Sequence, residues 1–233
     1  MRLISLLEKI NTQIFITATE LDRDTKFIDC FKHVLGAQSK SRSHEYDLLA
    51  ILVANATNQS IYGISQISDR TYDQLSTIQS NYIRLETLND AIDTINNATA
   101  RLPIFKHYNI HDDIVHASAD GQKFESRRET FKTRYSSKYF GTNKGVSAVS
   151  LIANHVAINA RVIGANEHES HFIFDLLMSN SSDIIPNMLS TDTHGVNHIN
   201  FALLDLFGYT FAPRYANVSN IINERIKEIK NPS

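Results

Sequence analysis

The sequence has little of what builds a secreted or membrane-embedded protein. Cys30 is the only cysteine among the 233 residues, which excludes a disulfide framework and any cysteine-rich zinc site. The apolar run at the N-terminus is interrupted by Glu8 and Lys9, and no stretch approaches the roughly 20 apolar residues of a membrane span. These absences predict a cytoplasmic protein with no membrane partner.

A large net charge is also lacking, because 23 basic and 25 acidic residues nearly cancel to −2 at pH 7. This balance argues against a uniformly basic nucleic-acid binder, although the local distribution of charge matters more. One window, from residue 123 to residue 144, holds seven basic residues against two acidic ones: Lys123, Arg127, Arg128, Lys132, Arg134, Lys138 and Lys144 against Glu125 and Glu129. Aromatic rings lie among these cations, so the window is either a DNA-contacting surface or a solvated charged face.

Residues 1 to about 110 have the apolar spacing of a helical subdomain. The block from Tyr46 to Val53 is expected to be a buried helix with Ser43 as its N-cap. Leucine and isoleucine recur every three or four residues from Thr71 to about Ala100, which predicts one long helix with a single apolar stripe. Pro103 is expected to end that helix.

Beyond residue 110 the pattern changes to strands and tight turns, since six of the eight glycines lie past residue 120. We expect strands at about 114–119, 146–153 and 157–163, which favour an antiparallel meander. A helix at 168–178, a strand at 187–191, a helix at 198–207, a short strand at 209–212 and a helix at 218–230 should follow. This order predicts an α/β fold in which a helical N-terminal region precedes a ribonuclease-H-like core at residues 111–233.

Two short segments, ADGQKF at 119–124 and STDTHG at 190–195, each place an aspartate at the end of an apolar stretch. If the two strands that they end are neighbours in one sheet, Asp120 and Asp192 reach the same edge, where carboxylate oxygens can hold Mg²⁺ for phosphoryl chemistry. Taken singly, Asp120 followed by glycine is also typical of a turn, and Asp192 could cap a following helix. The pair together favours a metal-dependent nucleic-acid enzyme.

Ten histidines raise the alternative of a zinc site. His168 and His171 are three residues apart, and His194 and His198 are four apart, but neither pair has the glutamate-containing pattern of zinc proteases. A structural metal is therefore not favoured, and His194 remains a residue that either orients DNA or water or belongs to a turn.

Several longer segments resemble one known family. ADGQKF, YFGTNKGVS at 139–147, RVIGANEHESHFIFDLLM at 161–178 and STDTHGVNHINFALLDLFGYTFAPRY at 190–215 are similar to the catalytic region of Tn-three-type replicative transposon transposases. The resemblance is dense from about His116 to Tyr215, and DLLAILVANATNQSIYGI at 47–64 and the helix around 83–88 are similar to the helical region that precedes that core.

This resemblance implies a DNA transposase of the Asp-Asp-Glu class, which nicks transposon ends and transfers the strand with Mg²⁺ or Mn²⁺. Asp120 and Asp192 match the first two family acids, as catalytic residues and metal ligands. Lys123, Arg127, Arg128 and Lys144 are candidate contacts to the DNA backbone. DNA, namely transposon ends and target, is the expected partner, together with a second copy of the chain or an intact transposase.

The chain also departs from the family pattern. The family's glutamate lies on a helix beyond the FAPR-like segment, further downstream than Ser233, so we expect a truncated and incomplete core with little activity alone. Glu228 follows Asp192 with 35 residues between them, a spacing found in retroviral integrases, and is an alternative third ligand on an ordinary charged helix. Ala119 stands where the family usually has serine.

A second function class remains open at this point. The chain could be a catalytically incomplete DNA-binding or interaction module that associates with an intact transposase, with the apolar stripe from Leu75 to Ile95 as its interface if that stripe is exposed. A stand-alone metal nuclease would require Glu228.

Overall fold

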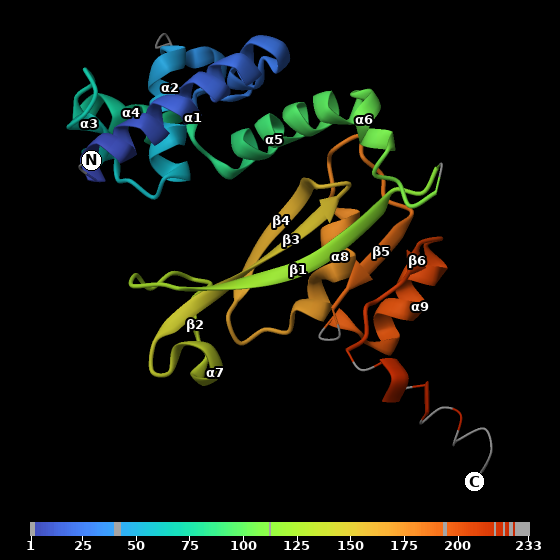
Figure 1. The fold of residues 1–233 in the computed structure, drawn as a ribbon. Helices are drawn as coiled ribbons and strands as arrows, with labels where there is room; N and C mark the ends of the chain where they lie inside the picture. Colours follow the sequence, from blue (N-terminus) through green and yellow to red (C-terminus); the bar gives the residue numbers. More distant parts are fainter. Residues whose placement is uncertain are drawn as a thin grey trace. The chain divides into compact units, whose positions relative to one another are not determined.

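The computed structural model describes residues 3–39, 43–111, 113–192, 195–216, 218–220, 222–223 and 226 (Figure 1). The chain divides into two compact units, residues 1–98 and 99–233, and each is described by itself. The sequence-based division between residues 110 and 111 stays a prediction. In the described part of the chain, no helix has both the length and the apolar content needed to cross a bilayer.

The first unit is helical. Its elements are α1 (Leu3–Thr25), the 3₁₀ helices η1 (Phe27–Cys30) and η2 (Gly36–Gln38), α2 (Glu45–Ala56), α3 (Ile61–Ser65), α4 (Tyr72–Tyr82) and most of α5 (Leu85–Ala100). Fully buried side chains of α2 and α4, among them Leu49, Ile51 and Leu75, form its apolar centre. The predicted buried helix at 46–53 is confirmed as α2, but its N-cap is His44 rather than Ser43, since the His44 ring accepts from the Tyr46 amide at 3.3 Å.

The single long helix expected at residues 71–100 is wrong, because two helices occupy this range. Ile83 adopts an extended backbone and ends α4. Thr87 then donates to the Tyr82 carbonyl at 2.8 Å and accepts from the Arg84 amide at 3.1 Å, so its hydroxyl replaces the backbone bonds lost at the break. The apolar spacing continues across the break, which is why periodicity alone did not reveal it. Pro103 does not end α5 but begins a short helix, α6 (Pro103–Lys106).

The second unit is built on one mixed sheet. Its strands are β1 (His116–Glu125), β2 (Arg134–Tyr135), β3 (Lys144–Ala153), β4 (Val156–Gly164), β5 (Met188–Thr191) and β6 (Thr210–Phe211). The helical elements are α6, α7 (Ser137–Phe140), the 3₁₀ helix η3 (Glu169–Phe172), α8 (Ile173–Met178) and α9 (His198–Leu206). The strand order is β2-β3-β1-β5-β6, and β4 pairs with β3 (Figure 1).

The pairing directions confirm the predicted order of elements from the first strand to the strand at 209–212. Most of the helix expected at 218–230 lies outside the described residues. β1, β3 and β4 form an antiparallel meander, whereas β5 runs parallel to β1 and β6 runs parallel to β5. The parallel connections pass through α8 and α9, as crossover connections require. The unit is thus an α/β fold with the predicted ribonuclease-H-like succession of three antiparallel strands and then alternating helices and parallel strands.

One buried cluster holds this sheet to its helices. Alternate residues of β3 are buried, including Val149 and Leu151, and they meet Ile173 and Leu176 of α8 and Leu204 of α9. Alternation with a period of two is what a strand with one covered face produces. The residues between the buried ones on β3 are less buried and lie on the other face of the sheet.

Two local expectations need correction. β1 does not end at Ala119 but continues to Glu125, because β3 pairs with it along its whole second half. Asp120 therefore lies inside a strand, and the aspartate-glycine pair is not a turn. The helix expected from His168 begins instead as η3 and becomes α-helical only at Ile173.

A candidate metal-binding edge of the sheet

Two aspartates lie side by side where the parallel strands β1 and β5 meet. Ala119 of β1 and Thr191 of β5 are register partners, and each is followed directly by an aspartate, Asp120 and Asp192. Both register partners are buried, and both aspartates are exposed. Neighbouring strands lie about 4.8 Å apart, and both aspartates line one depression at the end of these strands. The prediction that these strands are neighbours is confirmed, and we call this pair the acid edge.

The turn after β5 holds the Asp192 carboxylate. Its Oδ1 accepts a hydrogen bond from the Gly195 amide at 3.2 Å. A Cβ on Gly195 would sit 2.5 Å from the Thr191 side chain, so the chain folds back this closely only because glycine is there. The alternative in which Asp192 caps the next helix is wrong, because Asn197 caps α9 by accepting from the Asn200 amide at 2.7 Å.

Glu169 of η3 is a third carboxylate beside β1, and sequence reasoning missed it. Its carboxylate lies against the backbone of Gly121, where an added Cβ would come within 2.1 Å of Glu169 Cδ. The same carboxylate accepts from the Lys123 ammonium at 3.3 Å and from Ser147 Oγ at 2.9 Å. The one sequence signal for this contact is the glycine after Asp120, which was assigned to a turn.

The acid edge lines a small depression of about 10 Å³, room for about one water-sized species. Its polar lining is Asp120, Glu169, Thr191 and Asp192. The Thr191 hydroxyl is buried and has no hydrogen-bond partner among the described residues. Carboxylate and hydroxyl oxygens are hard donors, so these residues fit Mg²⁺ or Mn²⁺. Within the described residues, no three His, Cys, Asp or Glu side chains are arranged to hold a metal ion.

Arg214 brings a cation to the same end of the sheet. Shortly after β6 its amide donates to the Thr191 carbonyl at 2.8 Å, and its guanidinium donates to Ser118 Oγ at 3.1 Å. Ser118 precedes Asp120 by two residues, so both lie on the same face of β1. Burial, and then the charge of Arg214, lower the pKa of His116 below its ordinary 6.5. No motif reasoning assigned Arg214 a role, although it stands in the FAPRY segment.

Arg127 and Arg128, two of the predicted DNA contacts, lie in the loop that follows β1. Both side chains are exposed. Among the described residues, neither guanidinium takes part in an ion pair or a hydrogen bond. The loop therefore presents two unneutralised positive charges to solvent.

The other two predicted DNA contacts, Lys123 and Lys144, are paired inside the molecule. The Lys123 side chain is 15% exposed and forms an ion pair with Glu169. The Lys144 side chain is 25% exposed and hydrogen-bonds the Glu129 carboxylate, which raises the pKa of Lys144 and lowers that of Glu129. Both lysines are engaged by carboxylates, so their role as DNA contacts stays a prediction.

Three other sequence candidates have a weaker structural basis. His168 and His171 have ring centroids 5.7 Å apart, and His168 Nδ1 bonds the hydroxyl of Ser170 at 2.9 Å, an arrangement that local packing explains. Glu228 and His194 both lie outside the described residues, so their suggested roles stay predictions.

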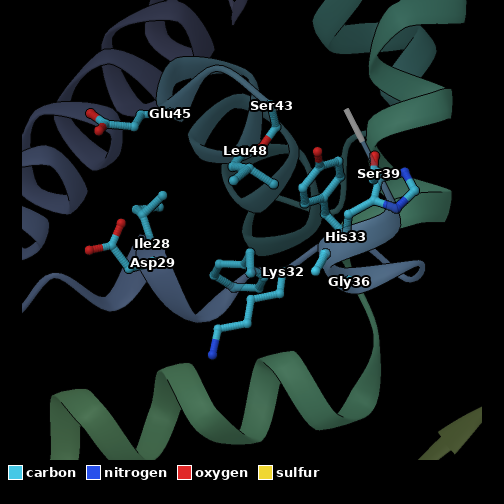
Figure 2. A pocket seen from close by; sticks show the side chains of 12 residues that line it. Ile28, Asp29, Lys32, His33, Gly36, Ser39, Ser43, Glu45 and Leu48 are labelled. Carbon is cyan, nitrogen blue, oxygen red and sulfur yellow. The ribbon is translucent and has the colours of Figure 1, made fainter. Parts of the chain in front are cut away.

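A larger pocket, of about 550 Å³, lies wholly within the helical unit between η1, η2 and α2. In Figure 2 the charged ends of Asp29, Lys32 and Glu45 lie apart and do not converge on one point. Two acids and one base of this kind do not form a chelating or catalytic group. Its volume exceeds that of the acid edge, but its chemistry is less specific.

Comparison with known proteins finds a matching family over most of the chain. Residues 18–232 match the family described as the Tn3 transposase DDE domain. The chain is 27% identical over 215 residues to the transposase for transposon gamma-delta of Escherichia coli (strain K12), covering 91% of this chain and 21% of that protein. It is 29% identical over 217 residues to the transposase for transposon Tn501 of Pseudomonas aeruginosa, with coverages of 91% and 21%. The chain thus spans about a fifth of the length of these relatives.

Among solved structures, a Mos1 transposase paired-end complex with the left transposon end aligns with 76% of this chain and 60% of that chain, at 8% identity and a TM-score of 0.30. The Mos1 strand transfer complex aligns over the same shares, at 11% identity and a TM-score of 0.31.

Proposed function

The chain belongs to the family of Tn3 transposase DDE domains, and we propose that it carries part of the catalytic region of a DNA transposase, which nicks transposon ends and transfers the strand. The observation that carries this proposal is the register of β1 and β5, which sets Asp120 beside Asp192. Sequence similarity aligns motifs, whereas the register independently brings two carboxylates to one edge. We further propose a cytoplasmic location, where such DNA lies.

Asp120 and Asp192 would hold a Mg²⁺ or Mn²⁺ ion, with the Thr191 hydroxyl beside them. When bound, such an ion lowers the pKa of a water or DNA hydroxyl and offsets the charge on the reacting phosphate. The Gly195 amide fixes the Asp192 carboxylate, and the Glu169 carboxylate packs on Gly121 and fixes the path of β1. Both contacts hold the two ligands in place before DNA arrives.

The positively charged side chains near the acid edge and in the loop after β1 would favour binding of a polyanion such as DNA. Arg214 is tethered to Ser118 on the face of β1 that carries Asp120, and it would bind a phosphate next to the acid edge. Arg127 and Arg128 would contact phosphates farther along the DNA, as would Lys123 and Lys144 if they leave their carboxylate partners. Arg is suited to this role because its fork of donors matches phosphate oxygens.

A second candidate is a module that binds DNA or an intact transposase without catalysing a reaction. The observation in its favour is that no three His, Cys, Asp or Glu side chains of the described residues, Glu169 included, are arranged to hold a metal ion. The apolar stripe suggested as its interface is mostly used internally, because Leu75 and Tyr82 are buried and Ile78, Leu88 and Ile95 pack on the core of the helical unit. Association with a second copy or an intact transposase stays a proposal.

DNA binding with and without metal separates the two candidates. Fluorescence anisotropy with a labelled duplex and a nicked duplex would measure affinity in EDTA, in Mg²⁺ and in Mn²⁺ for the wild type, Asp120→Asn and Asp192→Asn. Asp205→Asn is the matched control, since Asp205 is an exposed aspartate on α9. Nicking of supercoiled plasmid would be followed in the same samples.

The catalytic proposal predicts tighter DNA binding in metal than in EDTA, with the gain lost in both acid-edge variants and kept in the control. A DNA affinity that is the same in EDTA and in metal, and the same in the wild type and both acid-edge variants, would favour the non-catalytic module. Failure of the wild type to bind DNA under any of these conditions would contradict both.

A further inference from the structure

Phe131 is an apolar ring with almost no protein around it. It is 90% exposed, more than any other large hydrophobic side chain in the described part of the chain. Single exposed apolar residues are common, but a whole phenyl ring in water forfeits the stabilisation that burial would provide. The position of this ring, in the loop between β1 and β2, therefore needs a reason.

The loop around Phe131 is held in one conformation by its own hydrogen bonds. Thr133 donates from its amide and its hydroxyl to the Thr130 carbonyl at 3.2 and 2.9 Å and accepts from the Thr130 amide at 3.0 Å. Arg134 donates to the Phe131 carbonyl at 2.8 Å, and Lys132 donates to the Val162 carbonyl of β4 at 2.7 Å. The turn is thus fixed at both ends, and the ring is presented to solvent rather than left there by a loose loop.

The loop that carries the ring also carries exposed cations. Arg127 and Arg128 are exposed in the same loop and make no ion pair among the described residues. The acid of this loop, Glu129, is neutralised by Lys144. A protein partner for an apolar ring would favour apolar neighbours, whereas exposed cations in the same loop as an aromatic ring match the alternation of phosphate and base in a DNA strand.

We propose that Phe131 stacks on an unpaired DNA base while Arg127 and Arg128 bind the flanking phosphates. This inference rests on the proposed function, in which nicked transposon ends supply bases at strand termini that leave the helical stack easily. An aromatic face accepts any base, so the contact holds a frayed or nicked end without reading its sequence.

Phe131 is not part of the acid edge. The depression there is lined by residues of β1, β3, β5, η3 and α8 and by Asp192 and Gly195, and Phe131 is not among its lining residues. The ring is therefore proposed as a contact to DNA and not as a reacting group.

Tryptophan substitution gives a direct test, because the chain contains no tryptophan. In Phe131→Trp the new indole would be the single tryptophan, and stacking on a base would quench its fluorescence. The probes are a blunt duplex and a forked duplex with five unpaired nucleotides at one end. Anisotropy would compare the wild type, Phe131→Ala and Phe131→Trp, with Leu206→Ala as the matched control, since Leu206 is a 76% exposed apolar residue on α9.

We expect Phe131→Ala to weaken binding of the forked probe by about 5- to 100-fold, the range of one lost base stack, and to change blunt-duplex affinity less than twofold. Phe131→Trp should bind like the wild type and be quenched by the forked probe. Unchanged forked-probe affinity in Phe131→Ala, with an unquenched tryptophan, would overturn the proposal and leave the proposed function standing.

Two other outcomes would also decide the matter. A change of oligomeric state in Phe131→Ala, measured by sedimentation and with DNA affinity unchanged, would make the ring a contact between copies and overturn base stacking. Failure of the wild type to bind either probe would overturn both this inference and the proposed function.

Discussion

The acid edge and the basic segment that follows it, residues 123–144, use charge in opposite ways. At the acid edge the backbone register of β1 and β5 brings Asp120 and Asp192 together, and both carboxylates are exposed. In the basic segment the lysines at the two ends, Lys123 and Lys144, are paired with carboxylates. The sheet brings two exposed acids to one edge, whereas the basic segment has its two terminal lysines in ion pairs with carboxylates. A count of cations in the sequence therefore overstates the positive charge that DNA can contact.

Gly121 lies between Asp120 and the basic segment and packs against Glu169. Gly121→Ala would drive a methyl group into the Glu169 carboxylate, 2.1 Å from its Cδ, and should lower the free energy of unfolding by about 1–3 kcal/mol, as overpacking does. The measurement is urea unfolding followed by circular dichroism. Gly63→Ala is the matched control, because a Cβ there meets its nearest atom at an ordinary 3.7 Å and should stabilise the helix by about 0.4–1 kcal/mol.

The mechanism can be checked by a double substitution. The double variant Gly121→Ala, Glu169→Ala lacks the clash. Its loss of unfolding free energy should therefore be much smaller than the sum of the losses in the two single variants. Additive costs would mean that Gly121 is required for some other reason.

The exposed arginines should dominate DNA binding by the basic segment. Replacing Arg127 and Arg128 together by glutamine removes two phosphate contacts and should reduce the slope of log affinity against log salt by roughly 1.8. Replacing Lys144 by glutamine should reduce it less, because its ammonium is already bonded to Glu129. Anisotropy titrations at several salt concentrations give these slopes. Equal slopes for the two variants would mean that the paired Lys144 contributes to DNA binding as much as the exposed arginines do.

Lys123 should contribute more to the free energy of unfolding than an exposed lysine of the same segment. Lys123→Met removes the ammonium that donates to the Glu169 carboxylate and leaves the bond from Ser147. The change should cost about 1 kcal/mol, the typical net contribution of one hydrogen bond. Lys138→Met is the control, because the Lys138 side chain is exposed and lies over the Tyr139 ring. Urea unfolding would show whether the first variant is the less stable.

His116 gives the smallest effect and a defined sign. Its pKa is lowered in the folded chain by burial and by Arg214, so below about 6.5 the unfolded chain binds a proton that the folded chain does not. The free energy of unfolding of the wild type should therefore fall as the pH drops below 6.5. That of His116→Gln should fall less over the same range. Urea unfolding at pH 7 and pH 5.5 compares the two. A steeper fall in the variant would reverse the sign of the contribution.

The order of elements was predictable because strands and helices carry different apolar periods and because glycine marks the turns of the second unit. The neighbouring positions of Asp120 and Asp192 were predictable for the same reason, since both follow buried strand residues. The length of β1 was not, because aspartate followed by glycine suits a turn locally, and only the pairing with β3 keeps the strand extended through it.

Contacts between distant residues were the part that the sequence did not disclose. Glu169 reaches β1 from η3, and Arg214 reaches Ser118 across β5. Neither residue type nor spacing distinguishes these side chains from the many other charged ones, because such contacts arise from the packing of the whole unit. The break between α4 and α5 was not predicted for a related reason. The Thr87 side chain hydrogen-bonds the backbone groups at the break, while the apolar spacing continues across it.

The most direct test of the account is whether Asp120 and Asp192 bind one divalent ion together. Mn²⁺ titration followed by electron paramagnetic resonance would measure the affinity of the wild type, Asp120→Asn, Asp192→Asn and the double variant, with Asp205→Asn as control. We expect each single variant to bind at least about tenfold more weakly and the double variant to be little worse than either, because one site has already been lost. Wild-type affinity in both single variants, or losses that simply add, would contradict a shared site.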